Sequence, residues 1–563
     1  MEKDHLKENE LLFVPLGGTE EIGMNFNLYG YGPPKAHDWI IIDIGITFGD
    51  DTTPGIDIIL PDPKFIIDRR DKLHGIILTH GHEDHLGAVP YLWDKLRCPV
   101  YATPFTAALL RSKLEFTGNA RDIEIIEIPL KSKFDIGPFS IEFLSLTHSM
   151  PEPNGCIIRS PLGIIFHTGD WKFDPDPVIG PASDLDALKS LGDEGVLAAV
   201  VDSTNVFVSG SSGSEANILK NLSKLISECK GQVAVACFAS NVARLKTIYE
   251  AATLNGRSVC FVGRSLWRIN AAARQAGYLT DLPAFIEAED VKHIPKEQVL
   301  FICTGSQGEP KAALARIAAN DHREVKLGRG DTVIFSSRII PGNELAISRL
   351  QNKLIENNVS VINDQNGDIH VSGHPAEDEL IEMYQYIRPK VAIPVHGEIR
   401  HLKKHGEIAA DCQVPEIIIV KNGSVVRLSQ NNAQIVDEVH AGRLSFDGQR
   451  IISVNSDVIK DRSRIMYNGV AVLSLVIDYF GKIVEVPQLT THGLVEQDEK
   501  LDILRDIVTQ IEDELNLMSD NVVRDDLKVS EMARIIVRRY FKDTQKKRPL
   551  TSVHLIRVVN ANS

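Results

Sequence analysis

The sequence has no long apolar run and no paired cysteines, and its N-terminus lacks a signal pattern. No stretch of eighteen or more apolar residues occurs in the 563-residue chain, which excludes the usual pattern of a transmembrane helix. The seven cysteines are scattered singly, without a Cys-x-x-Cys pair, so neither a disulfide framework nor a thiolate zinc site is expected. The first residues, MEKDH, are charged, so we expect a cytoplasmic protein without membrane contact.

Charge and length narrow the class of protein further. Lysine and arginine (61) are outnumbered by aspartate and glutamate (76), which gives a net charge of −15. Such a chain does not bind nucleic acid indiscriminately, because phosphate neutralisation needs a basic surface, although a local basic groove is compatible with this charge. A chain of 563 residues exceeds one ordinary hydrophobic core, so we expect two to four domains.

Two kinds of segment follow each other along the chain. Residues 11–170 contain mainly short strands separated by turns, and few long amphipathic stretches interrupt them. From about residue 214 strands alternate with helices, which favours a parallel sheet. The last hundred residues form another α/β unit, with strands predicted at 470–477, 482–486 and 551–559 and helices near 499–517 and 529–543. We therefore expect an α/β protein of several domains.

The segment LTHGHEDHLG, residues 78–87, concentrates metal-binding side chains in one turn. It follows the apolar run GIIL, so the cluster lies at the C-terminal end of a predicted strand, where α/β proteins commonly build sites. Imidazole nitrogens and carboxylate oxygens bind zinc and similar divalent ions. Four ligands on one tight turn cannot surround one ion with good geometry. We therefore assign His80 and His82 to one metal, and Asp84 and His85 to a second.

Three further candidate ligands follow apolar strands elsewhere: His148 in SLTHSMPEPNG, Asp170 in IIFHTGDWKFD and His396 in VAIPVHGE. Their shared placement at strand ends predicts that they meet the first cluster at one rim of a sheet. Asp170 suits a bridging position because each of its two oxygens can bind one metal, and His396 would complete the second metal's ligands. His167 lies within the strand before Asp170, and we expect it to pack or to hydrogen-bond to a neighbour.

These motifs resemble those of the metallo-β-lactamase superfamily. The run from His80 to His85, followed by His148 and Asp170, is similar to its motif set, and Asp43 in IIIDIG matches an aspartate that supports the turn without binding metal. More than two hundred residues separate Asp170 from His396, and this insertion resembles the β-CASP domain of nucleic-acid-processing members. VDSTN, HVSGH and PVHGE, which contain Asp202, His374 and His396, are similar to the three added motifs of that subgroup. Glutamate is common at the position of Asp202, and the shorter acid should still serve as a partner behind the ligands.

Together with FASNVAR, TGSQGEP and the C-terminal unit, the motifs resemble the bacterial ribonuclease J family over nearly the whole chain. The resemblance implies an αββα sandwich formed by residues 1–212 and 373–448, a β-CASP domain at 213–372, a linker at 449–464 and a small C-terminal α/β domain at 465–563. It also implies a homodimer or homotetramer, with other RNA-decay proteins as further partners.

The expected chemistry follows from the ligand set. Two divalent ions about 3.5–4 Å apart lower the pKa of a bridging water and hold the attacking and leaving oxygens of a phosphodiester in line. Zinc is favoured because imidazole dominates the ligands, with manganese as the alternative. The departing 3′ oxygen needs a proton or a metal, and the resemblance makes His374 the candidate general acid, with Asp84 and Asp202 as further catalytic residues. The segment around His374 also has the pattern of a helix start with proline near its first position, and the two roles are compatible.

Two segments have the pattern of a phosphate-binding loop. In CFASNVAR a strand ends shortly before a helix, so Ser240 and free backbone amides would face an anion, and HVSGHPAE repeats this arrangement with Ser372 and Gly373. The resemblance supports a terminal-phosphate pocket formed by Ser240, His370, Ser372, Gly373 and His374. We therefore expect a metal-dependent ribonuclease that degrades single-stranded RNA from 5′ to 3′, prefers 5′-monophosphate ends, also cleaves internally, and acts in rRNA processing and mRNA decay.

Two other classes of function, and the role of one C-terminal segment, are not decided by the sequence. A small-molecule metallo-hydrolase would not need the large insertion, and a non-catalytic RNA-binding scaffold would not need the full ligand set. The C-terminal segment RIIVRRYFKDTQKKRP is basic with an aromatic pair. It is either a solvated helix face or a contact for RNA or another subunit.

Overall fold

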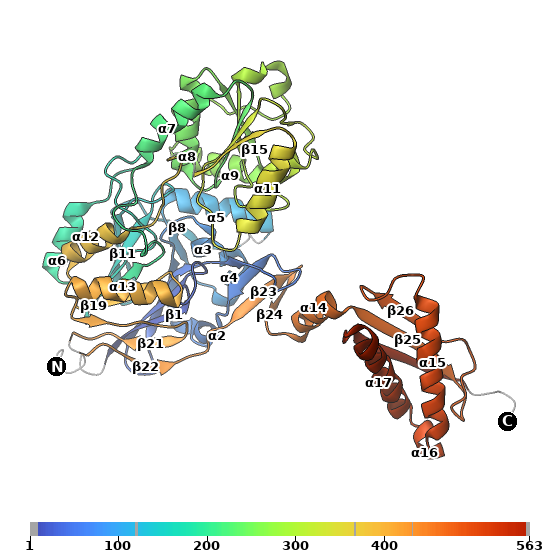
Figure 1. The fold of residues 1–563 in the computed structure, drawn as a ribbon. Helices are drawn as coiled ribbons and strands as arrows, with labels where there is room; N and C mark the ends of the chain where they lie inside the picture. The colour runs from blue at the N-terminus through green and yellow to red at the C-terminus, as the bar shows by residue number, and fades with distance from the viewer. Residues whose placement is uncertain (1–8, 119–121, 365–367, 431, 559–563) are drawn as a thin grey trace. The chain divides into compact units, whose positions relative to one another are not determined.

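The computed structural model of the chain describes residues 9–118, 122–364, 368–430 and 432–558, and it separates into two compact units (Figure 1). Unit 1 comprises residues 1–47 and 60–442, and unit 2 comprises residues 48–59 and 443–563. Among the described residues, no helix combines the length and the apolar character that crossing a bilayer requires.

Two large sheets form a sandwich in unit 1. The first sheet has the strand order β22-β21-β1-β2-β3-β6-β7-β8, and the second has the order β20-β19-β13-β12-β11-β10-β9. The first sheet consists of β1 (Glu10–Gly17), β2 (Phe26–Gly32), β3 (Asp38–Ile44), β6 (Leu73–Ile77), β7 (Val100–Ala102), β8 (Ile125–Glu127), β21 (Ser424–Arg427) and β22 (Gln434–Glu438). The second consists of β9 (Lys133–Ile136), β10 (Phe139–Ser145), β11 (Asn154–Ser160), β12 (Gly163–His167), β13 (Ala198–Asp202), β19 (Val391–Val395) and β20 (Glu416–Ile417).

The sheets share one apolar core, and helices cover their outer faces. Phe13 of the first sheet and Phe143 of the second belong to the same cluster and are at most 1% exposed. On the outer face of the second sheet, Phe166 packs in a separate cluster with Leu188 and Met383 from two helices. The helices of the sandwich are α2 (Lys64–Ile67), α3 (Glu83–Leu86), α4 (Val89–Leu96), α5 (Pro104–Thr117), α6 (Leu185–Glu194), α12 (Glu377–Ile387) and α13 (Ile399–Asp411), with a 3₁₀ turn at Arg70–Lys72. This is the αββα arrangement that the sequence predicts.

The inserted region builds a five-stranded parallel sheet with the order β15-β16-β14-β17-β18. Its strands are β14 (Val233–Ala236), β15 (Ser258–Val262), β16 (Val299–Cys303), β17 (Thr332–Phe335) and β18 (Ser360–Ile362). Its helices are α7 (Glu215–Glu228), α8 (Val242–Leu254), α9 (Arg264–Gln275), α10 (Ala313–Ala318) and α11 (Glu344–Glu356), with 3₁₀ turns at Val291–His293 and Lys296–Gln298. Helices α7, α8, α9 and α11 surround this sheet in Figure 1. The alternation of strands and helices therefore gives the expected parallel layer.

Two smaller sheets are formed by unit 2 together with the adjoining residues Thr47, Leu60 and Pro61. The first has the order β24-β23-β5-β4, and the second has the order β26-β25-β27, in which β25 pairs parallel with β27. The elements are β4 (Thr47–Phe48), β5 (Ile58–Pro61), β23 (Arg443–Asp447), β24 (Arg450–Ser453), α14 (Asp457–Asn468), β25 (Val470–Ile477), β26 (Gln488–His492), α15 (Lys500–Leu517), α16 (Asp520–Val523), α17 (Asp526–Gln545) and β27 (Leu550–Arg557). Leu473 of β25 packs with Ile507 of α15 and Phe541 of α17 in a core of its own. Residues 449–464, where we expect a linker, carry β24 and most of α14.

Two expectations about secondary structure were wrong. The strand predicted at 482–486 lies instead at Gln488–His492, because Val484 and Val486 are exposed whereas Leu489 and Thr491 face the core. The N-terminal part also contains a fourteen-residue helix, α5, that the prediction of mainly short strands missed. Seven of its residues are buried, so its apolar positions extend around much of the helix and the amphipathic periodicity is weak.

Candidate metal centre

The LTHGHEDHLG segment forms a tight turn between β6 and α3. His80 lies in the turn, and His82 is the N-cap of α3 in an extended conformation. Asp84 and His85 lie in the first turn of that helix, where an acidic residue is favoured by the helix dipole. The sequence therefore brings all four side chains to the end of β6, and the strand-to-helix turn points them in different directions.

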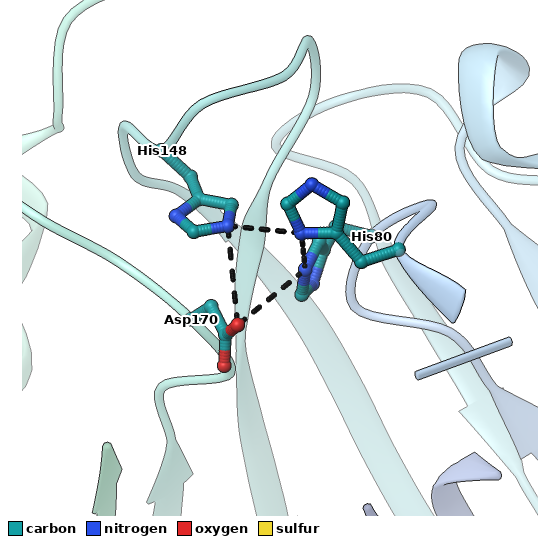
Figure 2. Close-up of side chains that lie close together, drawn as sticks. His80, His148 and Asp170 are labelled. Carbon is teal, nitrogen blue, oxygen red and sulfur yellow. Dashed lines mark hydrogen bonds and ion pairs between the residues drawn. The ribbon is translucent and has the colours of Figure 1, made fainter. Parts of the chain in front are cut away.

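The first group of candidate ligands consists of His80, His82, His148 and Asp170. Nδ1 of His82 lies 3.0 Å from Nε2 of His80 and 3.1 Å from Nε2 of His148. Nitrogens bound to one tetrahedral zinc at about 2.0–2.1 Å would lie roughly 3.3 Å apart. The imidazole nitrogens therefore converge at the spacing that a shared ion requires, and Figure 2 shows His148, His80 and Asp170 meeting from separate segments.

The second group consists of Asp84, His85, Asp170 and His396. Oδ2 of Asp84 lies 3.2 Å from Nε2 of His396 and 3.7 Å from Nε2 of His85. His396 follows β19 and has a left-handed backbone conformation with φ 54°, which is uncommon outside glycine and clusters at functional sites. This strained turn directs the His396 ring toward ligands that precede it by more than two hundred residues.

Asp170 belongs to both groups through different oxygens. Its Oδ2 lies 3.7 Å from Nε2 of His80 and 3.9 Å from Nε2 of His148. Its Oδ1 lies 3.2 Å from Nε2 of His85 and 3.6 Å from Nδ1 of His396. The carboxylate is 3% exposed, so solvent does not compete for either oxygen. This geometry fits one carboxylate between two cations.

Asp43 lies behind the second group. Its Oδ2 is 2.7 Å from Nδ1 of His85, and its Oδ1 accepts a hydrogen bond of 2.8 Å from the backbone N–H of Thr79. A carboxylate bonded to the far nitrogen of a histidine fixes the orientation of the ring and raises its basicity as a ligand. Asp43 therefore bonds to the turn through Thr79 and to the ring of His85.

The electrostatics of the two groups differ. Burial lowers the pKa of His80 and of His148 well below the ordinary value, and it lowers the pKa of His82 to about 4. Burial also acts to lower the pKa of His396, but the Asp170 carboxylate and hydrogen bonds to Asp202 and Asp84 outweigh it, so that pKa is raised. The three rings of the first group are thus neutral at physiological pH, with lone pairs available for a metal.

His374 and Asp202 form a pair beside the two groups. Nδ1 of His374 lies 2.8 Å from Oδ2 of Asp202 and 3.9 Å from Oδ2 of Asp170. Burial acts to lower the pKa of His374, but Asp202 and Asp170 outweigh it and the pKa is raised. With Nδ1 engaged by Asp202, Nε2 is the ring nitrogen left for another partner. Helix α12 begins at Glu377 with Ala376 as its N-cap, so the expected helix start is present and Pro375 lies two residues before its first position.

The expected phosphate-binding residues lie in two segments joined by a buried arginine. Nη1 of Arg244, in the first turn of α8, donates hydrogen bonds to the carbonyls of Ser336 and Ile369 at 2.9 and 3.0 Å. Arg244 therefore ties the segment after Ser240 to the one before His370. Nδ1 of His370 is buried without a hydrogen-bond partner among the described residues.

The second segment contacts the metal ligands directly. Oγ of Ser372 accepts a hydrogen bond of 3.2 Å from the backbone N–H of His374. Nδ1 of His148 is hydrogen-bonded to the carbonyl of Gly373, and a side chain at Gly373 would collide with the His148 ring. Only glycine therefore allows this segment to approach the first ligand group so closely.

Thr204 is a candidate site residue that the sequence did not predict. Oγ1 of Thr204 lies 2.6 Å from Nδ1 of His396 and donates a hydrogen bond of 2.7 Å to Oδ1 of Asp202, so it holds both side chains. Its position within VDSTN was the available signal. The prediction that His167 hydrogen-bonds to a neighbour is confirmed, because its Nδ1 lies 2.8 Å from the Tyr29 hydroxyl.

Comparisons with known proteins agree with this geometry. Family models match in order along the chain: a beta-lactamase superfamily domain over residues 39–188, the ribonuclease J beta-CASP domain over 230–354, a Zn-dependent metallo-hydrolase RNA specificity domain over 361–412 and the ribonuclease J C-terminal domain over 457–558. A solved structure of a protein of unknown function from Enterococcus faecalis shares the fold, with a TM-score of 0.51 and 16% identity over 74% of this chain and all of that one.

Several relatives extend over most of the chain, among them ribonucleases of three bacteria. Ribonuclease J from Sinorhizobium meliloti is 39% identical, with 99% of each chain covered. Ribonuclease J 1 from Streptococcus pyogenes is 38% identical over 89% of each chain. Ribonuclease J2 from Bacillus subtilis is 35% identical over 90% of this chain and 92% of the relative.

The sandwich, the buried histidine and aspartate cluster and the matched domains define a metal-dependent hydrolase with the metallo-β-lactamase fold and a β-CASP insertion. The identity extends over both the sandwich and the inserted domain, and the C-terminal unit has its own match. The chain belongs to the ribonuclease J family, and it is a metal-dependent ribonuclease that acts in RNA processing.

Proposed function

We propose that this ribonuclease uses two divalent ions, zinc in preference to manganese, and degrades single-stranded RNA from a 5′-monophosphate end, with internal cleavage as a second activity. The observation that carries the proposal is the position of the Asp170 carboxylate, whose two oxygens face two separate groups of histidines. His80, His82 and His148 would hold one ion, and Asp84, His85 and His396 the other. Ions held there would activate a water molecule for attack and neutralise charge on the phosphate.

The residues around the ions would perform the remaining steps. Asp43 and Thr204 hold His85 and His396 from behind, so neither ring needs to reorient as substrate binds. Asp202 keeps a proton on Nδ1 of His374 and leaves Nε2 to protonate the departing 3′ oxygen. The raised pKa of His374 supports this role, because a general acid must carry its proton at the working pH.

The terminal phosphate would lie between Ser240 and the segment from His370 to His374. The buried and unpartnered Nδ1 of His370 supports this placement, since a buried polar atom normally finds a partner. Only glycine at 373 permits the close approach to His148, which would place the terminal-phosphate pocket beside the metal centre and the next phosphodiester of the strand at the ions. A triphosphate would bring additional charge without matching donors. Processive decay should therefore favour monophosphate ends.

Domain boundaries and assembly are part of the proposal. The inserted domain at 213–372 encloses the match to the beta-CASP family model, and the C-terminal domain at 465–563 overlaps the match to the ribonuclease J C-terminal domain. We propose a homodimer or homotetramer in which the C-terminal domain takes part. The complete ligand set and the family membership favour the ribonuclease over both a small-molecule hydrolase and a non-catalytic scaffold.

The test compares one RNA sequence carrying either a 5′-monophosphate or a 5′-triphosphate, labelled at its 3′ end and incubated with the full chain. The proposal expects a shortening ladder from the monophosphate RNA, little from the triphosphate RNA, and loss of both in the presence of a chelator. Equal decay of both RNAs would place the terminal-phosphate pocket elsewhere. Undiminished cleavage after verified metal removal would contradict the metal centre itself.

A further inference from the structure

An exposed phenylalanine lies just beyond the catalytic residues. Phe207 follows the VDSTN motif by two residues, and its side chain is 55% exposed. The guanidinium carbon of Arg400 lies 6.0 Å from the centre of the Phe207 ring, and the His401 ring meets it nearly edge-on at 5.1 Å. Such an arrangement keeps a large apolar face in water while its neighbours fix its position.

The Phe207 surface is continuous with the second ligand group. Arg400 and His401 are at the start of α13, four and five residues after His396. A Cβ at Gly397 would lie 2.8 Å from Cβ of His401, so His401 packs directly against the turn that presents His396. Phe207 therefore stands one layer of residues outside the proposed metal ligands.

A cation contacts the same motif. Nη1 of Arg338, in the loop after β17 of the inserted domain, donates a hydrogen bond of 2.8 Å to Oδ1 of Asn205. Nδ2 of Asn205 in turn donates a hydrogen bond of 3.2 Å to the carbonyl of His374. Gln307 holds this loop by donating to the Arg338 carbonyl at 2.8 Å. The exposed guanidinium is thus fixed next to the residue proposed as the general acid.

Among the described residues, the lack of a carboxylate partner makes the Arg338 guanidinium available to a ligand. Across the ranges that the structure describes, its guanidinium forms no ion pair with a carboxylate, although the chain carries a net charge of −15. An exposed aromatic face and an unpaired cation beside a nuclease centre match the two groups that single-stranded RNA offers. Bases stack on aromatic rings whatever their sequence, and phosphates bind arginine.

We propose that Phe207 and Arg338 form a binding surface for the RNA strand immediately outside the catalytic centre, with one base stacked on Phe207 and one phosphate bound by Arg338. The proposal deepens the proposed function and rests on it in one respect, the placement of His374 at the reacting phosphate. It adds a base contact from the sandwich and a phosphate contact from the inserted domain. Both contacts are independent of base identity, as degradation of varied RNA requires.

The first test combines changes in protein and substrate. The substrates are 5′-monophosphate RNAs that each carry one abasic nucleotide at a different position. For the wild-type protein, KM should rise by about 5- to 100-fold, relative to intact RNA, when the abasic nucleotide occupies one position near the cleavage point. Phe207→Ala should raise KM for intact RNA by a similar factor and abolish the abasic effect at that position only. Phe207→Tyr, which keeps the ring, should retain the abasic effect.

A matched control exists on α5. Phe116 is 69% exposed, the guanidinium carbon of Arg268 lies 5.0 Å from its ring centre, and its helix is outside the VDSTN and PVHGE motifs in the sequence. Phe116→Ala should keep the full abasic effect. A Phe207→Ala chain that retains the abasic effect would overturn the base contact. A chain that keeps its KM but changes its sedimentation would identify Phe207 as a subunit contact instead.

The second test measures salt dependence. Loss of one phosphate contact to a single strand should reduce the slope of log KM against log salt concentration by roughly 0.7. We expect this reduction in Arg338→Gln and not in Arg329→Gln, which removes an exposed arginine from a turn of the same inserted domain. An unchanged slope in Arg338→Gln would overturn the phosphate contact. These readouts concern RNA affinity, so they can fail while the metal assignment holds, and metal stoichiometry tests that assignment separately.

Discussion

Nδ1 of His374 lies 2.8 Å from Oδ2 of Asp202, although the two residues are 172 positions apart in the sequence. Asp202 is at the end of β13 in the sandwich, and His374 follows the inserted domain. The pair therefore forms only when the chain returns from the insertion to the sandwich. Under the proposed role of His374 as general acid, proton delivery to the leaving oxygen would depend on correct placement of the inserted domain.

Replacement of His374 by alanine should reduce kcat on RNA by about 10²- to 10⁴-fold, because the 3′ oxygen then leaves without a proton. An aryl phosphodiester, whose leaving oxygen needs no proton, should be cleaved at nearly the wild-type rate by the same variant. The measurement is kcat on both substrates. A proportional loss on both would assign His374 to metal binding or folding.

Asp202→Asn should shift the pH dependence of the reaction. Burial acts to lower the pKa of His374, and Asp202 is the largest influence that raises it. Without that negative charge the pKa of His374 falls, so the protonated acid is lost at lower pH and the basic limb of the kcat profile moves toward acid. A basic limb at its wild-type position in Asp202→Asn would show that another group sets it.

Ser372→Leu should separate the two modes of RNA cleavage. The larger side chain would block the terminal-phosphate pocket, and each charge-assisted hydrogen bond lost costs about 1.5–3 kcal/mol. Internal cleavage needs the metal centre and the RNA path but no terminal phosphate, so it should suffer less. The readout is the ratio of 5′-exonucleolytic to internal cleavage on one labelled RNA. Ser360→Leu, an exposed serine on edge strand β18, serves as the control. Equal losses of both activities in Ser372→Leu would assign its loop to the chemistry or the fold.

His405 should make the fold sensitive to acid. It is fully buried, with Nδ1 2.8 Å from the Ser203 hydroxyl and Nε2 2.8 Å from the Tyr384 hydroxyl, and burial lowers its pKa to about 4. Between pH 6.5 and about 4 the unfolded chain binds a proton that the folded chain does not, so the stability contribution is complete above pH 6.5 and declines as pH falls. The decline amounts to about 3 kcal/mol for this residue.

The test is urea unfolding at pH 8 and pH 5, followed by circular dichroism. His405→Gln should be less stable than wild type at pH 8, because its hydrogen bonds are imperfectly replaced, and should lose less stability between the two pH values. The same loss in both proteins would mean that other buried groups control the acid sensitivity.

The sequence predicted the elements that carry strong local patterns. Short apolar runs such as β6 and β12 and the alternation from Glu215 onward gave correct strands and helices because their residue types leave few alternatives. Helix α5 was missed because it is buried around much of its circumference, and the 482–486 strand was misplaced because an alternating pattern does not show which segment finds a core.

In the site, the candidate ligands that follow strands could be predicted, because a strand end is recognised from its local sequence. Several residues that support the site through hydrogen bonds from outside the two ligand groups could not be predicted. Thr204 contacts His396, which lies 192 positions away, and Arg244 joins Glu215 to Ser336 and Ile369. Such contacts depend on the three-dimensional return of the chain, and a single hydroxyl or guanidinium carries no periodic signal in the sequence. The exposure of Phe207 could not be predicted from the sequence either, because a single phenylalanine after a motif is ordinarily a core residue.

Metal stoichiometry tests most directly whether Asp170 joins two ions. Elemental analysis of the purified full chain, with protein determined by amino-acid analysis, should give two divalent ions per chain. Asp170→Asn should retain at most one, and Asp84→Ala should lose the ion of the second group, with far-ultraviolet circular dichroism unchanged in both. A single ion per chain in a fully active wild-type protein, or two ions retained in Asp170→Asn, would contradict the account.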